Sequence, residues 1–132
     1  MIFKKIKMEK KEKNFHPAED CPIRNLLCRL GDKWSLLVLI SLNANGTMRF
    51  NDIYKSIGDI SQRMLTVTLR SLEADSLVSR EIYPEVPLRV EYTLTKSGES
   101  LMPRLNTLVE WALEHLQEIV KSRRLRETSK NE

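Results

Sequence analysis

Apolar residues recur along most of this chain with the spacing of amphipathic helices. A stripe at positions i, i+3, i+4 and i+7 predicts a first helix that begins at Pro22 and ends before Gly31. The stripe consists of Ile23, Leu26, Leu27 and Leu30. Asp32 is a suitable cap for a second helix over residues 33–42. This helix is apolar on almost every side, so we expect it to be central to the core.

A turn is expected at residues 43–46, which read NANG, and a short strand at residues 47–49. The apolar positions of residues 50–57 then predict a short helix that Gly58 ends. Ser61 is a good cap for the next helix, residues 61–75. One face of that helix gathers Leu65, Leu69 and Leu72, flanked by Met64 and Thr68. The opposite face carries Arg63, Thr66, Val67, Arg70 and Ala74.

The pattern changes to strict alternation in residues 77–83 and 89–94, which predicts two strands. The loop between them reads PEVPL, residues 84–88, so the strands are expected to form a hairpin. Thr95 caps a last helix to about residue 121, and Pro103 should kink this helix or split off its first turns. Two helices in tandem followed by a hairpin are typical of a winged helix-turn-helix. We therefore predict a mostly helical α+β domain with a two-stranded wing over residues 77–94.

In such a fold the second helix of the pair, residues 61–75, enters the major groove of DNA with its N-terminal residues at the base edges. Gln62 and Arg63 stand at that end, and their side chains can pair with adenine and guanine. Ser61 and Thr66 are candidates for phosphate contacts, and Arg70 lies on the same face. A polar face that serves only solubility is the alternative interpretation.

The two arginines of the hairpin, Arg80 and Arg89, suit contacts with the backbone or minor groove. Glu81, Glu85 and Glu91 dilute this positive charge. The alternative is therefore that both arginines pair with these glutamates across the strands.

The last helix has an apolar arc roughly 200° wide, whereas about 100° suffices to cover one core. The surplus predicts a second buried surface, and a two-fold homodimer is the economical explanation. The candidate residues are Leu105, Leu108, Trp111, Ala112, Leu116 and Ile119. Packing against the first helix of the same chain is the alternative. His115 is expected to pack at the rim of this arc.

The net charge of the chain is weak evidence for DNA binding by the domain itself. The net charge of +4 lies in the ends of the chain, because residues 1–13 carry +4, residues 121–132 carry +3 and the middle carries −3. We expect residues 1–14 to be a lysine-rich arm, residues 15–121 to be the domain, and residues 122–132 to be a basic tail. These ends would strengthen phosphate contacts.

Several classes of protein are disfavoured. No apolar run approaches the about 18 residues of a membrane span, and no secretory signal is visible at the N-terminus, so a cytoplasmic location is expected. We find no phosphate loop, no zinc spacing and no catalytic constellation, so neither a cofactor, a metal nor an enzyme activity is predicted.

Cys21 precedes a helix, where a thiol tends to ionise, so a redox switch is chemically possible. Cys28 lies about two turns further on, near 10 Å by helical rise, too far for a bridge within the helix. An inert role for the cysteines is the alternative.

Three segments of the chain together resemble the HxlR-type winged helix-turn-helix regulators, which are related to the MarR group. The segments are CPIRNLLCRLGDKWSLLVLISL, RFNDIYKSIGDISQRMLTVTLRSLEADSLV and YPEVPLRVEYTLTKSGESL, and the match covers about residues 20–120. The resemblance implies a homodimer that binds operator DNA through two recognition helices and dimerises through its first and last helices. It also places Cys21 where some members sense oxidants, quinones or aldehydes. One departure is Ser76, since the family usually has glycine at this helix end, where φ is expected to be positive.

Our leading hypothesis is thus a homodimeric, sequence-specific DNA-binding regulator. A thiol-based redox or electrophile sensor switched through Cys21 is the first alternative. The second is a protein-interaction module that never contacts DNA, which the net negative charge of residues 14–120 favours.

Overall fold

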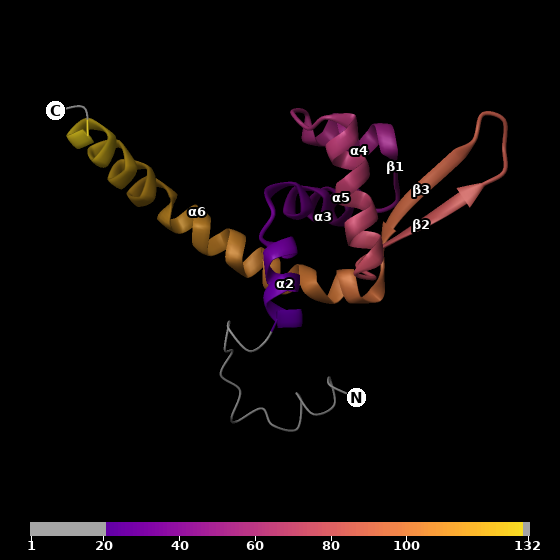
Figure 1. The fold of residues 1–132 in the computed structure, drawn as a ribbon, viewed down its shortest axis with the longest axis horizontal. Coiled ribbons are helices and arrows are strands. Elements are labelled where there is room, and N and C mark those ends of the chain that lie inside the picture. The colour runs from indigo at the N-terminus through magenta and orange to yellow at the C-terminus, as the bar shows by residue number, and fades with distance from the viewer. Residues whose placement is uncertain (1–20, 131–132) are drawn as a thin grey trace, which may run out of the picture.

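The computed structural model describes residues 21–130 of the chain. The fold is mostly helical and contains a small three-stranded sheet (Figure 1). Its elements are α2 (Cys21–Leu30), α3 (Lys33–Asn45), β1 (Met48–Arg49), α4 (Phe50–Ile57), α5 (Gln62–Ala74), β2 (Val78–Tyr83), β3 (Arg89–Leu94) and α6 (Lys96–Lys130). This order confirms the predicted winged helix-turn-helix. The expected lysine-rich arm, residues 1–14, lies outside the described residues.

The helix-turn-helix consists of α4 and α5, and its boundaries follow local chemistry. Gly58 ends α4 with a φ of 93°, which a residue with a side chain rarely adopts. The Ser61 hydroxyl then accepts a hydrogen bond from the Met64 amide at 3.0 Å, so Ser61 caps α5 as predicted. Ile60 and Leu65, one on each side of this cap, are both buried, which fixes the direction in which the chain enters α5.

The core forms where α3, α5 and the start of α6 pack on the sheet. Its fully buried members are Val38, Leu39, Leu42, Ile53, Leu65, Leu69, Leu72 and Val78. α3 is central, as predicted, but it is three residues longer than expected, because residues 43–45 continue the helix and Gly46 ends it with a φ of 77°. The two residues Leu37 and Ile40 stay partly exposed on its outer side.

The sheet has the order β1-β3-β2, and both of its pairings are antiparallel. β1 pairs with the middle of β3, Met48 with Tyr92 and Arg49 with Glu91, and β2 pairs with the whole of β3 from Val78–Leu94 to Tyr83–Arg89. The predicted hairpin is therefore confirmed. β1 pairs only with Glu91 and Tyr92, so the part of the hairpin between these residues and its loop projects from the body as a two-stranded wing (Figure 1).

The turn after α5, residues 75–77, is tightly built. The Leu77 amide donates to the Leu72 carbonyl and the Ser76 amide to the Glu73 carbonyl, both at 3.0 Å, which is the pattern of a Schellman motif. Ser76 has a φ of 61°, which confirms the expected positive value. The Thr95 hydroxyl donates to the Ser76 carbonyl at 2.5 Å, so the start of α6 is tied to the same turn.

α6 corrects one expectation and narrows another. The helix continues to Lys130 instead of ending near residue 121, so residues 122–130 are its last turns and not a separate tail. It also runs through Pro103 without being split, so of the two expected effects of this proline only the kink remains. Pro103 is the eighth residue of α6, and it has no amide proton to donate to a carbonyl of the preceding turn. Met102 and Leu105, on either side of Pro103, are both buried in the core.

The arrangement separates two ends of the molecule (Figure 1). The loop between α4 and α5 and the tip of the wing lie at the upper side of this view. α2 and the beginning of α6 lie at the lower side, and α6 then extends away from the body toward the C-terminus. α5 spans the distance between the two sides.

Candidate nucleic-acid interface

The outward face of α5 carries the residues that the sequence singled out. Leu65, Leu69 and Leu72 occupy the buried face, so the opposite face points away from the core. Arg63 and Arg70 are exposed there and Thr66 is half-buried, while Gln62 is exposed at the N-terminal end of α5. The prediction of which α5 residues face outward is therefore confirmed, with one difference: Met64 is exposed instead of flanking the core.

The hydroxyl groups of Ser61 and Thr66 both form hydrogen bonds with the backbone of α5. Ser61 accepts from the Met64 amide, and the Thr66 hydroxyl donates to the Gln62 carbonyl at 2.9 Å. The Ser61 hydroxyl keeps its proton available for an acceptor such as a phosphate oxygen. Thr66 retains only acceptor capacity and its methyl group, which suits an apolar contact with thymine better than a phosphate contact.

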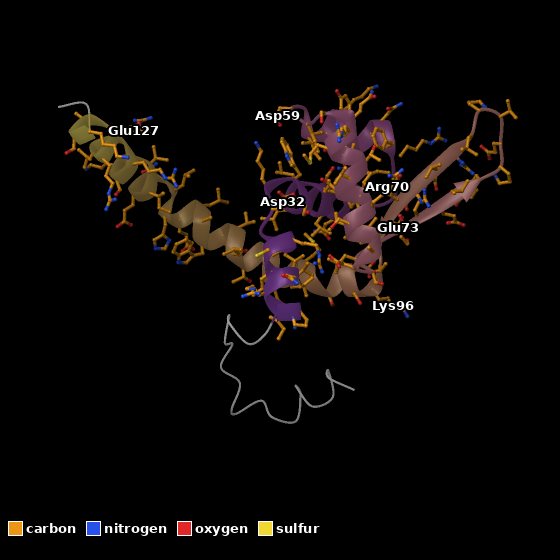
Figure 2. The ribbon with its side chains drawn as sticks, viewed as in Figure 1. Asp32, Asp59, Arg70, Glu73, Lys96 and Glu127 are labelled. Carbon is orange, nitrogen blue, oxygen red and sulfur yellow. The ribbon has the colours of Figure 1, made fainter. Side chains whose placement is uncertain are left out.

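The four candidate arginines fall into two classes. Arg63 and Arg70 on α5 take part in none of the ion pairs found among residues 21–130. Arg70 and Glu73 lie where α5 approaches the base of the wing (Figure 2). The wing arginines, by contrast, are both paired. Arg80 contacts the Glu73 carboxylate at 3.6 Å, and Arg89 contacts Glu85 at 3.1 Å and Glu91 at 3.6 Å.

Arg89 is built into the wing. Its guanidinium lies 3.9 Å from the centre of the Tyr83 ring, the residue with which it is paired in the strands, and its side chain is only 28% exposed. A hydrogen bond to the Glu81 carboxylate raises the pKa of the same Tyr83 phenol. The alternative from sequence is that both arginines pair with wing glutamates across the strands. Arg89 does pair with two of these glutamates, but Glu91 lies on its own strand and Glu85 in the loop, so neither contact crosses the strands. Arg80 pairs with α5 instead of across the strands.

The wing therefore offers little free positive charge. Its outermost residues are apolar or acidic, and Val86, at the tip, is fully exposed. Ile82 and Leu88 are also exposed. Electrostatic attraction for a polyanion is concentrated on α5, where Arg63 and Arg70 are unpaired among the described residues, while the wing can supply mainly shape and apolar contacts.

A second exposed surface lies on α6. Five of the six residues predicted for a dimer face are exposed, and Trp111, at 53%, stacks on His115 with 4.4 Å between the ring centres. These residues are Leu108, Trp111, Ala112, Leu116 and Ile119. Leu105 is only 6% exposed and packs in the core of its own chain, so we remove it from this face. We call the remaining five residues the α6 apolar face.

α2 does not cover the α6 apolar face. Its own apolar residues Ile23, Leu26 and Leu27 stay exposed, as do those of α6. Packing between the first and last helices of one chain, the alternative from sequence, is therefore not what the structure shows. Cys21 begins α2, but its side chain lies outside the described residues, and Cys28 is an exposed free thiol.

One polar contact was not foreseen from sequence. Arg29, in the last turn of α2, forms two hydrogen bonds with Asp75 at the end of α5, at 2.7 and 2.8 Å. Forty-six positions separate the two residues, so no local pattern reveals their contact.

Among residues 21–130 there is no group of acidic, histidine or cysteine side chains suited to a metal ion. In the same part of the chain, every helix is too short or too polar to cross a bilayer.

A sequence model of the HxlR-like helix-turn-helix matches residues 29–120, which is more than half of the chain. The chain belongs to the HxlR-like helix-turn-helix family. It is thus a transcriptional regulator of the helix-turn-helix class, and the winged fold described above is the fold of this class.

Similar proteins agree with this assignment. A protein of Methanothermobacter thermautotrophicus named as an HTH-type transcriptional regulator is 50% identical over 91 residues, 69% of each chain. The structure of YtfH from Salmonella typhimurium, named as a transcriptional regulator, is 35% identical with a TM-score of 0.75, and the match covers 85% of this chain and 99% of that one. The reduced form of HypR, named as a redox regulator, is 38% identical with a TM-score of 0.65 and matches 76% of this chain and 98% of its own.

The environment of Arg89 in this HxlR-type wing leads to a prediction about stability. Replacing Arg89 by Gln removes the contact with the Tyr83 ring and two ion pairs. We expect the free energy of unfolding to fall by about 1 kcal/mol. Urea unfolding followed by circular dichroism measures it. Arg80→Gln is the matched control, because it removes one longer contact, and equal losses in the two variants would contradict the structural role of Arg89.

Proposed function

We propose that this HxlR-type regulator is a homodimer that binds operator DNA in the cytoplasm. Each protomer places the N-terminal half of α5 in a major groove and the wing near the adjacent minor groove. The half-sites then lie about one helical turn, ~34 Å, apart. The observation that carries the proposal is the polar, outward face of α5, where Arg63 and Arg70 form no ion pair with any residue of 21–130 and lie opposite the buried leucines.

The chemistry of this face supports direct readout of bases. Gln62 and Arg63 are in the first turn of α5, the part of such a helix that reaches the base edges. Gln pairs with adenine and Arg with guanine through two hydrogen bonds each. The exposed Met64 and Val67 are apolar neighbours suited to thymine methyl groups. Arg70, two turns along the helix, is placed for a phosphate.

The wing residues take different parts in this proposal. Arg80 has to exchange its 3.6 Å contact with Glu73 for a phosphate, which is a small loss for a partly exposed pair. Arg89 is held by two glutamates and the Tyr83 ring, so it supports the shape of the wing and contacts DNA only at its edge.

Burial of the α6 apolar face supports the homodimer. Its five exposed apolar residues lie on one side of the helix, and contiguous apolar patches of this kind usually mark an interface. Two-fold pairing buries the same face of both protomers at once. It also supplies the two recognition helices that a palindromic operator requires.

The role of Arg63 can be tested directly. We expect Arg63→Ala to abolish specific binding to the operator, because one bidentate contact with guanine provides about 1–3 kcal/mol of discrimination. The probe is a duplex from upstream of the protein's own gene compared with a shuffled duplex, by fluorescence anisotropy at about 150 mM salt. Lys96→Gln removes the same charge from an exposed site at the far end of the fold and serves as control (Figure 2).

The outcomes separate the hypotheses. Loss of discrimination in Arg63→Ala with an unchanged dimer supports the assignment of α5. Intact operator affinity in this variant contradicts it. Equal binding of the wild type to both duplexes argues against specific recognition and favours an interaction with another protein.

The dimer face is tested by placing a charge in it. We expect Leu116→Glu to yield a monomer in sedimentation velocity, since a carboxylate would be buried without a partner in the α6 apolar face. Leu125→Glu is the matched control, because Leu125 is also exposed but lies beyond the C-terminal end of this face and half a turn around α6 from Leu116. A dimer that survives Leu116→Glu, or that Leu125→Glu disrupts equally, would place the interface elsewhere.

A second candidate function is redox or electrophile sensing through Cys21, and the similarity to HypR favours it. Cys21 is the first residue of α2, and the N-terminus of a helix favours a thiolate. We expect a mild oxidant to produce a covalent dimer or an adduct in the wild type and in Cys28→Ser, but not in Cys21→Ser. Non-reducing electrophoresis and mass spectrometry read this out. The same product in Cys21→Ser would end the hypothesis.

A further inference from the structure

The most constrained polar contact outside the α5 face is the ion pair between Arg29 and Asp75. Its two hydrogen bonds run from Nε and Nη2 of Arg29 to the two carboxylate oxygens of Asp75, at 2.7 and 2.8 Å. This fork geometry fixes the orientation of both groups, which a single contact does not. Hydrogen bonding to Asp75 also raises the pKa of the Arg29 guanidinium.

Asp75 stands on rigid backbone. It is the last residue before Ser76 in the Schellman turn of residues 75–77, and its amide donates to the Ser71 carbonyl at 3.0 Å. Its side chain is only 14% exposed. A displacement of Asp75 therefore has to move the C-terminal end of α5 as a unit, because the turn has little freedom of its own.

α6 is attached at the same turn. In addition to the Thr95 hydrogen bond, the Thr95 amide donates to the Leu77 carbonyl at 3.1 Å. The next turn of α6 packs so closely that a Cβ on Gly98 would lie 2.2 Å from that carbonyl oxygen. Any residue other than glycine would thus push α6 off the turn. The base of α6 and the end of α5 are held as one body.

α2, in contrast, is loosely attached. It packs on α3, but its apolar side chains Ile23, Leu26 and Leu27 are exposed. A groove of about 300 Å³ separates it from the start of α6, and Leu26 and Leu30 on one side face Leu77 and Leu101 on the other. With a groove beside it and its apolar side chains exposed, α2 is joined to the end of α5 by the ion pair of Arg29 with Asp75.

We propose that the Arg29–Asp75 ion pair is a positioning contact that couples the orientation of α2 to that of the recognition helix, and that it thereby sets the half-site spacing the dimer accepts. The inference rests on the proposed function, and it adds that α2, whose apolar side chains Ile23, Leu26 and Leu27 are exposed, lies at the dimer interface together with the α6 apolar face. A protomer without this pair keeps its base-reading residues, but the angle between its recognition helix and the interface is less well defined.

The test uses the full chain and a probe that the wild type selects. A duplex is selected from a random-sequence library by the wild-type protein, and derivatives are made with one or two base pairs added or removed at its centre. Each added pair rotates the half-sites by roughly 34° and separates them by about 3.4 Å. We expect the wild type to lose about tenfold or more in affinity per step, and Arg29→Gln to lose about threefold or less.

Three further variants sharpen the comparison. Arg29→Lys keeps the charge but not the fork, so we expect an intermediate dependence on spacing. The exchanged pair Arg29→Asp with Asp75→Arg should restore part of the wild-type dependence. Lys96→Gln removes one positive charge without breaking any ion pair found among residues 21–130 and should behave as the wild type. An unchanged spacing dependence in Arg29→Gln, or no recovery in the exchanged pair, overturns the inference.

A measurement without DNA separates the two proposals. Hydrogen–deuterium exchange of the amides of α2 should be about tenfold faster in Arg29→Gln than in the wild type and Lys96→Gln, while exchange in the middle of α5 stays the same. If the wild type selects no duplex, the proposed function fails, yet faster exchange in α2 still supports the positioning contact. Equal exchange in α2 contradicts it whatever the DNA result.

Discussion

The outward face of α5, on which the proposed function rests, depends on the burial of the opposite face of the same helix. Leu65, Leu69 and Leu72 insert into the core beneath α3, and with a helical period of 3.6 residues this determines which side chains point outward. Burial of the three leucines is therefore enough to orient the polar face of α5. A substitution in these leucines would therefore alter the orientation of Arg63 as well as the stability of the domain.

Much of this fold could be read from the sequence because its boundaries are local. Ser61 and Gly58 mark helix ends through their own side chain or lack of one, and the alternation in residues 89–94 marks a strand. The length of α6 escaped prediction since its last turns after residue 121 carry charges in place of apolar residues. Residues 122–130 show no hydrophobic periodicity, so only their helix propensity indicates that the helix continues.

The candidate site was foreseen to a different degree. The outward residues of α5 followed from periodicity, but the partners of the wing arginines did not. Arg80 pairs with Glu73 on another element, and Arg29 pairs with Asp75 across 46 positions. Such contacts depend on how elements pack, which a single sequence encodes only through the whole fold. Leu105 was misassigned for a related reason, because a helical wheel cannot say where one buried surface ends and the next begins.

The side of α6 that bears Trp111, Leu116 and Ile119 changes from apolar to charged side chains after Val120. Arg123 and Arg126 follow on the same side, beside Trp111, His115 and Ile119 in one shallow groove. A partner helix that slid toward the C-terminus would bring its leucines against these guanidinium groups and strip them of water. In the proposed homodimer, this change from apolar to charged residues would limit the two protomers to a single register, in which their α6 apolar faces coincide.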